Sequence, residues 1–331
     1  MRQFLRRAAK ACLPRLALVL SSITNHHTGS LILSSLSRFL ARKELGRLLG
    51  IEAFRSRLEH AVASKGLVLL SCHGHKLYVN MNDRGVAPGL FHGTYERTET
   101  ELFRRAVREG MRVVDLGANI GYYTLLAARL VGPSGMVYAF EPERSNFQLL
   151  DQNIRLNSYN NVVPIEKAVS NTCGRTELFI DLVNFGGHSF KRDYVTVPRQ
   201  SKPVIVETVT LDRFLGCTDD MHVDVIKMDI QGAEGLALAG ARQTLALSPE
   251  LTIFMEFSPY ALQNLHTPPE EVIRLLESAG LNRIQIIDEE TGATKSIAAQ
   301  ELLHICDAKR TDKYFWLNLL VRNSRDDEFK S

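Results

Sequence analysis

The chain has 331 residues, of which 45% are hydrophobic and 23% charged. This balance excludes an intrinsically disordered or collagen-like protein and allows a sizeable buried core. The net charge of +3 conceals an asymmetry, because residues 1–65 carry +9 and the remainder carries −6. An acidic body predicts that no nucleic acid is bound, since a phosphate backbone requires a basic surface.

The cysteines are five in number, widely spaced and never in a C-x-x-C pair: Cys12, Cys72, Cys173, Cys217 and Cys306. This spacing indicates neither a disulfide framework nor a zinc site, and it is typical of a reducing compartment. We therefore predict a cytoplasmic protein without a bound metal.

The N-terminal region is rich in Leu, Ala and Arg. Apolar residues recur at helical spacing over Phe4–Leu20 and Ser30–Ala63, which predicts a basic helical extension over residues 1–65. The apolar stretch Leu16–Ile23 is too short to span a membrane, and Pro14 beside it disfavours a secretory signal. We favour a helix packed on the body, and weak contact with an anionic membrane surface remains the alternative.

Two elements are expected before the main body of the fold. Short apolar or alternating runs at Leu67–Cys72 and Lys76–Met81 flank a turn and predict a β-hairpin. The segment Tyr95–Glu109 has polar capping residues ahead of an apolar face, the pattern of an amphipathic helix.

From Gly110 onward, strand-like and helix-like segments alternate, which predicts an α/β fold with a doubly wound, mostly parallel sheet. The predicted strands are Arg112–Leu116, Met136–Phe140, Val162–Lys167, Val223–Met228 and Leu251–Phe257, and the predicted helices are Tyr122–Val131, Arg144–Leu156, Ala233–Leu247 and Pro269–Ala279. Two β-prone pieces indicate an insertion near the carboxyl ends of the strands: Thr176–Leu182 and Ile205–Leu211. A final antiparallel pair at or near the sheet edge is predicted at Arg283–Asp288 and Tyr314–Val321, with a turn at Thr291–Gly292 between them.

The segment Val113–Thr124, VVDLGANIGYYT, predicts a strand, a glycine-containing turn and the start of a helix. Such a turn lets a ligand approach the backbone at the positive end of the helix. A dinucleotide site requires G-x-G-x-x-G, but Asn119 and Tyr122 occupy the second and third glycine positions. Asp115 instead favours a ligand with a cationic amine, because its carboxylate would repel phosphate.

Glu141 follows the next predicted strand, about twenty residues after Gly121, where an acidic residue binds the ribose hydroxyls of an adenosine-containing ligand. A ligand with an adenosine end, an amino-acid end and no phosphate is S-adenosylmethionine. The sequence therefore predicts this cofactor.

Four motifs between about Gly93 and Glu256 resemble, in the same order, those of the FkbM family of S-adenosylmethionine-dependent methyltransferases. They are Tyr95-Glu96-x-x-Glu99, VVDLGANIGYYTLLAARLVGPSG, AFEPERSNFQLLDQNIRLN and Lys227–Glu234. The resemblance implies a Rossmann-like class I methyltransferase fold with an antiparallel last strand. Taken with the residue pattern of the two termini, the sequence predicts a helical N-terminal extension over residues 1–65, an FkbM-type methyltransferase domain over residues 66–323 with its core motifs in 93–256, and a polar tail over residues 324–331. Gln231 departs from the family pattern, which typically has Glu there.

The resemblance also implies roles for individual residues. The methionine part of the cofactor would be held by Asp115 and by the backbone at Gly117, Asn119 and Gly121. Both ribose hydroxyls would donate to Glu141. Phe140 would lie near the adenine, Ala168 and Val169 would border it, and Glu96 would contact the cofactor or close over it.

Methylation of a hydroxyl benefits from a base that accepts its proton. The candidates, in order, are Asp229, Glu256 and His188. Each has an alternative interpretation: a helix cap, a partner of a basic residue and an ordinary loop histidine, respectively.

The family resemblance implies O-methylation of a hydroxyl on a sugar, glycolipid or secondary metabolite. The expected partner is therefore a small-molecule, carbohydrate or glycolipid acceptor. One alternative is a nicotinamide-dependent oxidoreductase, which the broken glycine pattern disfavours. The other is a non-catalytic member of the fold that binds the cofactor or a partner protein.

Overall fold

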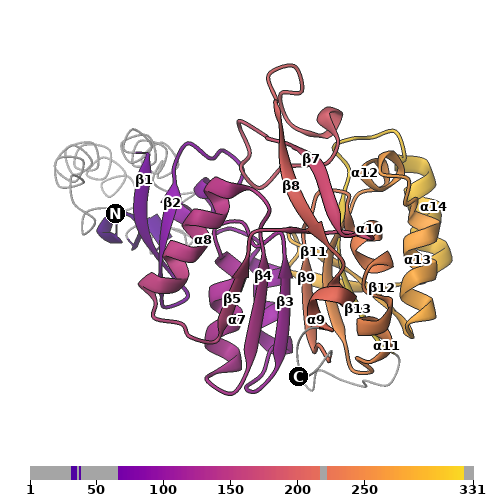
Figure 1. Cartoon of the computed structure of the whole chain (residues 1–331), viewed down its shortest axis with the longest axis horizontal. Coiled ribbons are helices and arrows are strands. Elements are labelled where there is room, and N and C mark those ends of the chain that lie inside the picture. The colour runs from indigo at the N-terminus through magenta and orange to yellow at the C-terminus, as the bar shows by residue number, and fades with distance from the viewer. Residues whose placement is uncertain (1–30, 36, 39–65, 217–221, 324–331) are drawn as a thin grey trace, which may run out of the picture. The chain divides into compact units, whose positions relative to one another are not determined.

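The computed structural model describes residues 31–35, 37–38, 66–216 and 222–323 (Figure 1). They belong to two compact units that divide between Tyr95 and Glu96. Most of the predicted helical extension and the predicted polar tail lie outside the described residues. Within the described ranges, no helix is both long enough and apolar enough to cross a membrane.

The N-terminal unit contains the predicted hairpin. Strand β1 (Leu67–Cys72) pairs antiparallel with β2 (His75–Asn80). Alternate residues of β2 are buried, the period of a sheet with one covered face. Helix α5 (Ala87–His92) follows and ends at Gly93, whose positive φ of 67° terminates the helix. The hairpin groups with this unit, although the sequence places it in the domain that begins at residue 66.

The second unit is built on an eight-stranded sheet in the order β12-β11-β13-β10-β9-β3-β4-β5. Neighbours from β10 to β5 are parallel, whereas β13 is antiparallel to β10 and β11. The strands are β3 (Arg112–Leu116), β4 (Met136–Phe140), β5 (Val162–Ile165), β9 (Val225–Met228), β10 (Thr252–Phe257), β11 (Leu281–Asp288), β12 (Ala293–Ile297) and β13 (Leu317–Asn323). The predicted sheet with an antiparallel last strand is confirmed.

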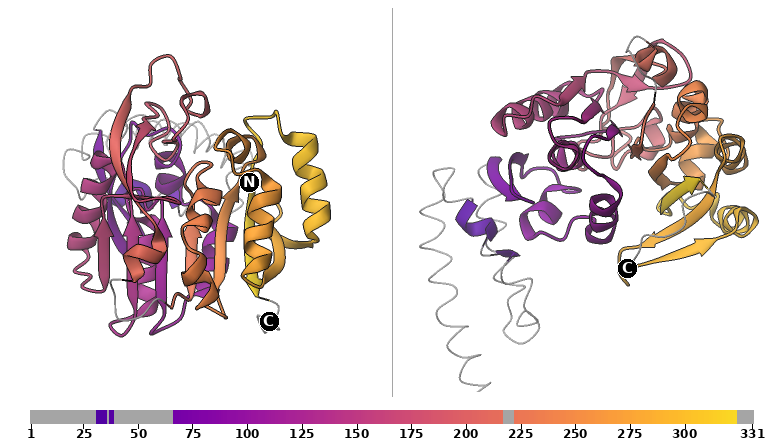
Figure 2. Two further views of the ribbon diagram at one scale, coloured as in Figure 1. Left: turned by 45° about the vertical axis from the view of Figure 1, so that its right-hand side comes forward. Right: turned by 90° about the horizontal axis from the view of Figure 1, so that it is seen from below.

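Helices lie on both sides of this sheet (Figure 2). They are α6 (Arg97–Ala106), α7 (Tyr122–Val131), α8 (Arg144–Leu156), α9 (Leu211–Leu215), α10 (Glu234–Ala239), α11 (Arg242–Ala246), α12 (Pro259–Asn264), α13 (Pro269–Ser278) and α14 (Ala299–Lys309). The helices predicted for Tyr122–Val131 and Arg144–Leu156 have these bounds in the structure.

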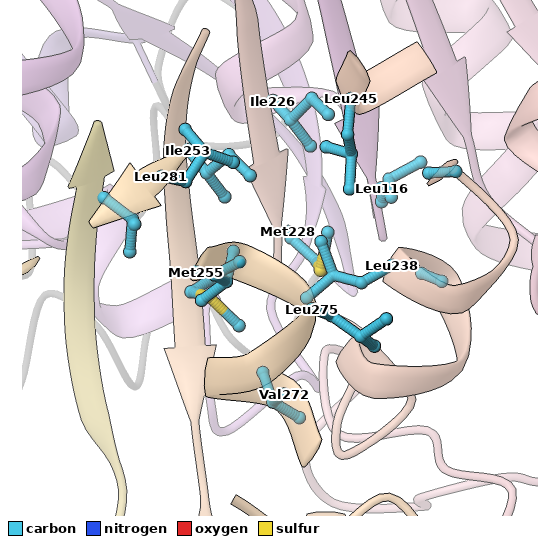
Figure 3. Close-up of a cluster of buried hydrophobic side chains, with 14 of the residues drawn as sticks. Leu116, Ile226, Met228, Leu238, Leu245, Ile253, Met255, Val272, Leu275 and Leu281 are labelled. Carbon is cyan, nitrogen blue, oxygen red and sulfur yellow. The ribbon is translucent and has the colours of Figure 1, made fainter. Parts of the chain in front are cut away.

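Side chains of the central strands alternate between two hydrophobic clusters. Ile226 and Met228 of β9 belong to the cluster under α10, α11 and α13, part of which is drawn in Figure 3. Val225 of the same strand belongs to the cluster formed with α6 and α7. We call this second side the α6–α7 face. The alternation places Lys227 on the α6–α7 face, because successive strand residues point to opposite sides.

The predicted insertion forms a separate three-stranded sheet of β6 (Ala168–Val169), β8 (Pro203–Val209) and β7 (Gly174–Phe179). The connection from β7 to β8 extends beyond the main sheet at the top of Figure 1. Within this connection, the Ser189 hydroxyl donates to the Gln231 carbonyl oxygen at 3.0 Å. The insertion therefore reaches the carboxyl edge of the main sheet.

The prediction of one helix over Ala233–Leu247 is wrong, because the segment forms α10 and α11 with a break at Gly240. A Cβ at Gly240 would lie 2.1 Å from the Ser170 carbonyl oxygen, so the backbone of another segment passes too close for a side chain. The Asp212 carboxylate accepts hydrogen bonds from the backbone N–H groups of Gln243 and Thr244. These bonds cap α11 at its start.

The C-terminal prediction is partly wrong. The two expected strands pair antiparallel as β11 and β13, but the turn at Thr291–Gly292 leads from β11 into β12. Helix α14 then fills the rest of the connection. Most of β12 is solvent-exposed, so its sequence lacks the apolar alternation of a buried strand.

Candidate active site at the carboxyl edge of the sheet

The turn between β3 and α7 contains the two glycines of the first motif. Gly117 has φ of 81°, and a Cβ there would lie 2.0 Å from the Asp229 carbonyl oxygen. Gly121 has φ of 96°, and its Cβ would lie 2.9 Å from the Leu150 side chain. Both glycines are therefore required by the chain's own backbone conformation and packing. That these glycines also let the cofactor approach the backbone stays a prediction.

Asn119 lies between these glycines and also has a positive φ, of 49°. Its backbone N–H donates to the Glu141 carboxylate at 2.8 Å. Its side-chain oxygen is buried and has no hydrogen-bond partner among the described residues. Because such an atom costs free energy when it stays unpaired, it fits a ligand that brings a hydrogen-bond donor.

Glu141 joins the turn to the loop after β4. Its second carboxylate oxygen accepts from the Glu143 backbone N–H at 2.8 Å. Burial raises the pKa of Glu141 to about 8, although these two backbone N–H groups act in the opposite direction. Each oxygen retains a further lone pair, so the carboxylate can also accept from ribose hydroxyls.

Asp115 is buried near the carboxyl end of β3 and accepts a hydrogen bond from the Thr124 hydroxyl at 2.5 Å. Burial raises the pKa of Asp115 to about 6, opposed by that hydrogen bond and by Lys227. A cationic amine would stabilise the ionised form of this carboxyl group. The residues of the turn thus fit the amino-acid end of S-adenosylmethionine.

A buried ion pair lies beside Asp115. Lys227 is directly opposite Asp115 on the neighbouring strand, and its ammonium group lies 2.9 Å from the Glu99 carboxylate of α6. The ammonium also lies 5.0 Å from the centre of the Tyr123 ring. Burial opposes the charge on Lys227, but the nearby carboxylates of Glu99, Glu96 and Asp229 raise its pKa. Lys227 therefore stays charged in the interior.

Glu96 precedes α6 with a positive φ of 37°. Its carboxylate accepts from the Tyr123 hydroxyl at 2.8 Å. Burial raises the pKa of Glu96 to about 7, opposed by the charge of Lys227. The structure thus brings Glu96 to the same acidic cluster as Asp115 and Asp229.

Gln231 connects the first two candidate bases. Its side-chain nitrogen donates to the Asp229 carboxylate at 2.7 Å and lies 3.4 Å from both Glu256 carboxylate oxygens. Burial, together with the charge of Asp229, raises the pKa of Glu256 well above its usual value. Because both neighbours are acceptors, an amide suits this position better than a third carboxylate.

The third candidate base, His188, lies in the insertion. Its Nδ1 accepts a hydrogen bond from the Asp181 backbone N–H at 2.9 Å, and burial lowers its pKa. The neighbouring Ser189 contacts Gln231, but no described contact joins the His188 ring to Asp229 or Glu256. His188 therefore stabilises the insertion, and one of its two ring nitrogens is already occupied.

Three residues predicted near the adenine are buried in hydrophobic packing. The Phe140 ring packs edge-on against Phe214 at 4.9 Å in the cluster opposite the α6–α7 face. Its backbone carbonyl accepts from the N–H groups of Gly117 and Ala118. Ala168 and Val169 form β6. Phe140 therefore contacts the turn through its backbone.

Sequence reasoning assigned no role to Lys227, Glu99 or Tyr123. A signal was present, because Lys227 interrupts an otherwise apolar buried strand, and a buried cation requires a carboxylate partner. The identity of that partner could not be read from the sequence, because Glu99 lies more than a hundred residues earlier on α6.

Comparison with known proteins gives one match to a family model, that of the methyltransferase FkbM domain, over residues 115–281. Among curated relatives, 2-O-methyltransferase NoeI of Sinorhizobium fredii is 28% identical over 186 residues, which are 50% of this chain and 71% of the relative. Protein-L-isoaspartate O-methyltransferase of Methanothrix thermoacetophila is 39% identical over 56 residues, which are 17% of this chain and 27% of the relative. The chain spans less than half the length of the first four curated relatives.

Solved structures with a similar arrangement include M. jannaschii TYW2 in complex with AdoMet. It is 16% identical, with coverage of 77% of this chain and 84% of that chain and a TM-score of 0.42. The family model carries the assignment, since it covers half of the chain, including the turn, Glu141 and Lys227–Glu234. The chain belongs to the FkbM family of methyltransferases, whose cofactor is S-adenosylmethionine.

Proposed function

We propose that this protein methylates a hydroxyl group of a sugar, glycolipid or secondary metabolite. The observation that carries the proposal is the Gln231 amide between the carboxylates of Asp229 and Glu256, next to the turn that fits the cofactor. When bound, S-adenosylmethionine supplies a methyl group activated by a sulfonium. The chain's own residues then have to position the acceptor and accept its proton.

The proposed cofactor residues are Asp115, the turn from Gly117 to Gly121, and Glu141. Asp115 would bind the amine, and Glu141 would accept from the ribose hydroxyls. Glu96 would close the site beside Tyr123, to which it is already hydrogen-bonded. Contact of Phe140, Ala168 and Val169 with the adenine remains a prediction.

Asp229 is the proposed base. Burial and the Asp229 charge raise the pKa of Glu256, which makes Glu256 the less suitable of the two carboxyl groups for accepting a proton. The Gln231 amide fixes one Asp229 oxygen at 2.7 Å and leaves the other available to an acceptor hydroxyl. The printed name of the relative NoeI, a 2-O-methyltransferase, supports a hydroxyl acceptor.

We place the reaction in the cytoplasm on the basis of the cysteine spacing. The division into a basic extension, a catalytic domain from residue 66 and a polar tail is part of the same proposal. Membrane contact by the extension remains an untested alternative.

The test is a mass-spectrometric search for the product. Purified full-length protein is incubated with cell extract and S-adenosylmethionine that carries a trideuterated methyl group. A metabolite or glycolipid that gains this label with wild-type protein, but not with Asp229→Asn, supports the proposal. Tight NAD binding without S-adenosylhomocysteine binding would instead indicate the oxidoreductase alternative.

A further inference from the structure

A small cavity lies between the insertion and helix α12. Its volume is about 50 Å³, and its walls include Lys191, Arg192 and Tyr194 from the insertion and Tyr260 from α12. A cavity of this size accommodates several water-sized groups. It is therefore large enough for the polar edge of a small ligand.

The cavity adjoins the proposed catalytic pair. The Ser189 hydroxyl, on its wall, donates to the Gln231 carbonyl oxygen. On the other wall, Ala261 packs against Gly232, where an added Cβ would lie 2.7 Å from the Ala261 side chain. One wall thus contacts Gln231 directly, and the other contacts the residue that follows it in the chain.

Tyr194 links the cavity to the acidic cluster. Burial, and then the Glu256 charge, raise its pKa, and its phenol forms a hydrogen bond with the Ser258 side chain. The Tyr194 ring is nearly parallel to the Tyr260 ring, with 24° between their planes and 6.3 Å between their centres. Neighbouring aromatic faces with polar groups at their edges suit the apolar faces and hydroxyls of a sugar ring.

The charges at the two ends of this region differ in sign. Lys191 and Arg192 give the cavity two cations against the single carboxylate of Asp193. The Arg192 guanidinium lies 5.1 Å from the centre of the Phe179 ring, which holds its position. Within the described ranges, no carboxylate is ion-paired with Lys191. The adjoining pair Asp229 and Glu256 is acidic. The two regions would therefore orient a ligand with its anionic group toward the cations and its hydroxyl toward the acidic pair.

We propose that this cavity is the acceptor subsite and that it takes a sugar carrying an anionic group, with the anion at Lys191 and the reacting hydroxyl toward Asp229. This inference rests on the proposed function and specifies its substrate class. The anionic group is a phosphate or a carboxylate, and both are recognised by the same cations.

The test measures binding of defined sugars to the full-length protein saturated with S-adenosylhomocysteine. Glucose 6-phosphate is compared with glucose, and galacturonic acid is compared with galactose. Inorganic phosphate is tested alone as a further probe. Each compound is titrated by ligand-observed NMR. We expect at least one acidic sugar to bind about tenfold more tightly than its neutral counterpart. The pair that shows the preference distinguishes phosphate from carboxylate.

Three variants locate the site. Lys191→Met should abolish the preference for the acidic sugar and leave binding of the neutral sugar unchanged. Tyr260→Ala should weaken both sugars, because the aromatic wall is lost. The charge-matched control Lys295→Met, at an exposed ion pair with Glu301 outside the cavity, should change neither.

The inference would be overturned by any of three results: equal binding of acidic and neutral sugars, no binding of any sugar, or a preference for the acidic sugar that survives Lys191→Met. S-adenosylhomocysteine is titrated first with each protein. If wild-type protein fails to bind S-adenosylhomocysteine, the proposed function is wrong. If it binds S-adenosylhomocysteine normally but the sugar titrations give one of the contradicting results, only the acceptor subsite is wrong.

Discussion

Lys227 of β9 and Glu99 of α6 form an ion pair of 2.9 Å in which the side chains are only 4% and 1% exposed. Lys227 also lies opposite Asp115 in the sheet and carries the positive charge that Glu96 and Asp229 experience. Within the part of the chain that the structure describes, Lys227 therefore interacts with several carboxylates on the α6–α7 face. Its removal should leave buried negative charge that nothing compensates.

Lys227→Met is the first predicted change. We expect the free energy of unfolding to fall by about 3–5 kcal/mol, the usual cost of removing one partner of a buried pair. Urea unfolding at neutral pH measures it. The double variant Lys227→Met with Glu99→Gln should recover part of the loss, and exposed Lys295→Met should change the free energy by less than about 1 kcal/mol. A small effect at Lys227 would mean that water or another cation compensates these carboxylates.

Gly117→Ala tests the contact between the turn and the Asp229 backbone. The added Cβ would lie 2.0 Å from the Asp229 carbonyl oxygen at a residue with φ of 81°. We expect a loss of about 3 kcal/mol or more in unfolding free energy, because both the clash and the backbone strain act against the fold. The control is Gly174→Ala, where the nearest atom is 3.9 Å from the new Cβ. Similar stability of the two variants would contradict the interpretation.

Stability of the ligand-free protein should fall as pH rises. Burial raises the folded-state pKa to about 6 for Asp115, about 7 for Glu96 and about 8 for Glu141 and Glu234. The folded chain therefore binds protons more tightly than the unfolded chain, whose glutamates titrate near 4.5. The resulting stabilisation is present below pH 4.5 and is lost as pH rises to about 8.

Thermal unfolding at a series of pH values between these limits measures this effect. Glu141→Gln should flatten the decline, because one of the contributing carboxyl groups is removed. Stability that increases steadily over the same pH range would show that these carboxyl groups are ionised in the folded protein.

Binding of S-adenosylhomocysteine should release protons at neutral pH. Hydrogen bonds from ribose hydroxyls favour the ionised form of Glu141, so they lower its pKa from about 8. Calorimetry in buffers of different ionisation enthalpy detects the released protons. Glu141→Gln should reduce the release and weaken binding by about 1–3 kcal/mol. An unchanged dissociation constant would remove Glu141 from the cofactor site.

Gln231→Glu should introduce a pH-dependent defect. Above neutral pH, a third carboxylate would repel Asp229 and lose the amide donor, so we expect about 1–3 kcal/mol of destabilisation. In acid, the new carboxyl group is protonated and can donate again, so stability should return toward that of wild type. Exposed Gln152→Glu on α8 is the matched control. A Gln231→Glu variant that unfolds like the control at every pH would contradict the amide bridge.

The main features of the fold were predictable because its local signals agree. The strand at Arg112–Leu116 and the helix at Tyr122–Val131 have the expected bounds, since apolar periodicity and the intervening glycines point to the same boundaries. The helix predicted over Ala233–Leu247 was wrong because its break at Gly240 depends on the distant backbone of Ser170. No local pattern contains that information.

The sequence by itself determined the family and the cofactor, because these depend on residue types at fixed short spacings. Only the tertiary structure decided that Lys227 meets Glu99 and that Gln231 lies between Asp229 and Glu256. It also decided that Phe140 packs away from the α6–α7 face. These relationships depend on which strands are neighbours and on which face each side chain lies, and both are set by long-range packing.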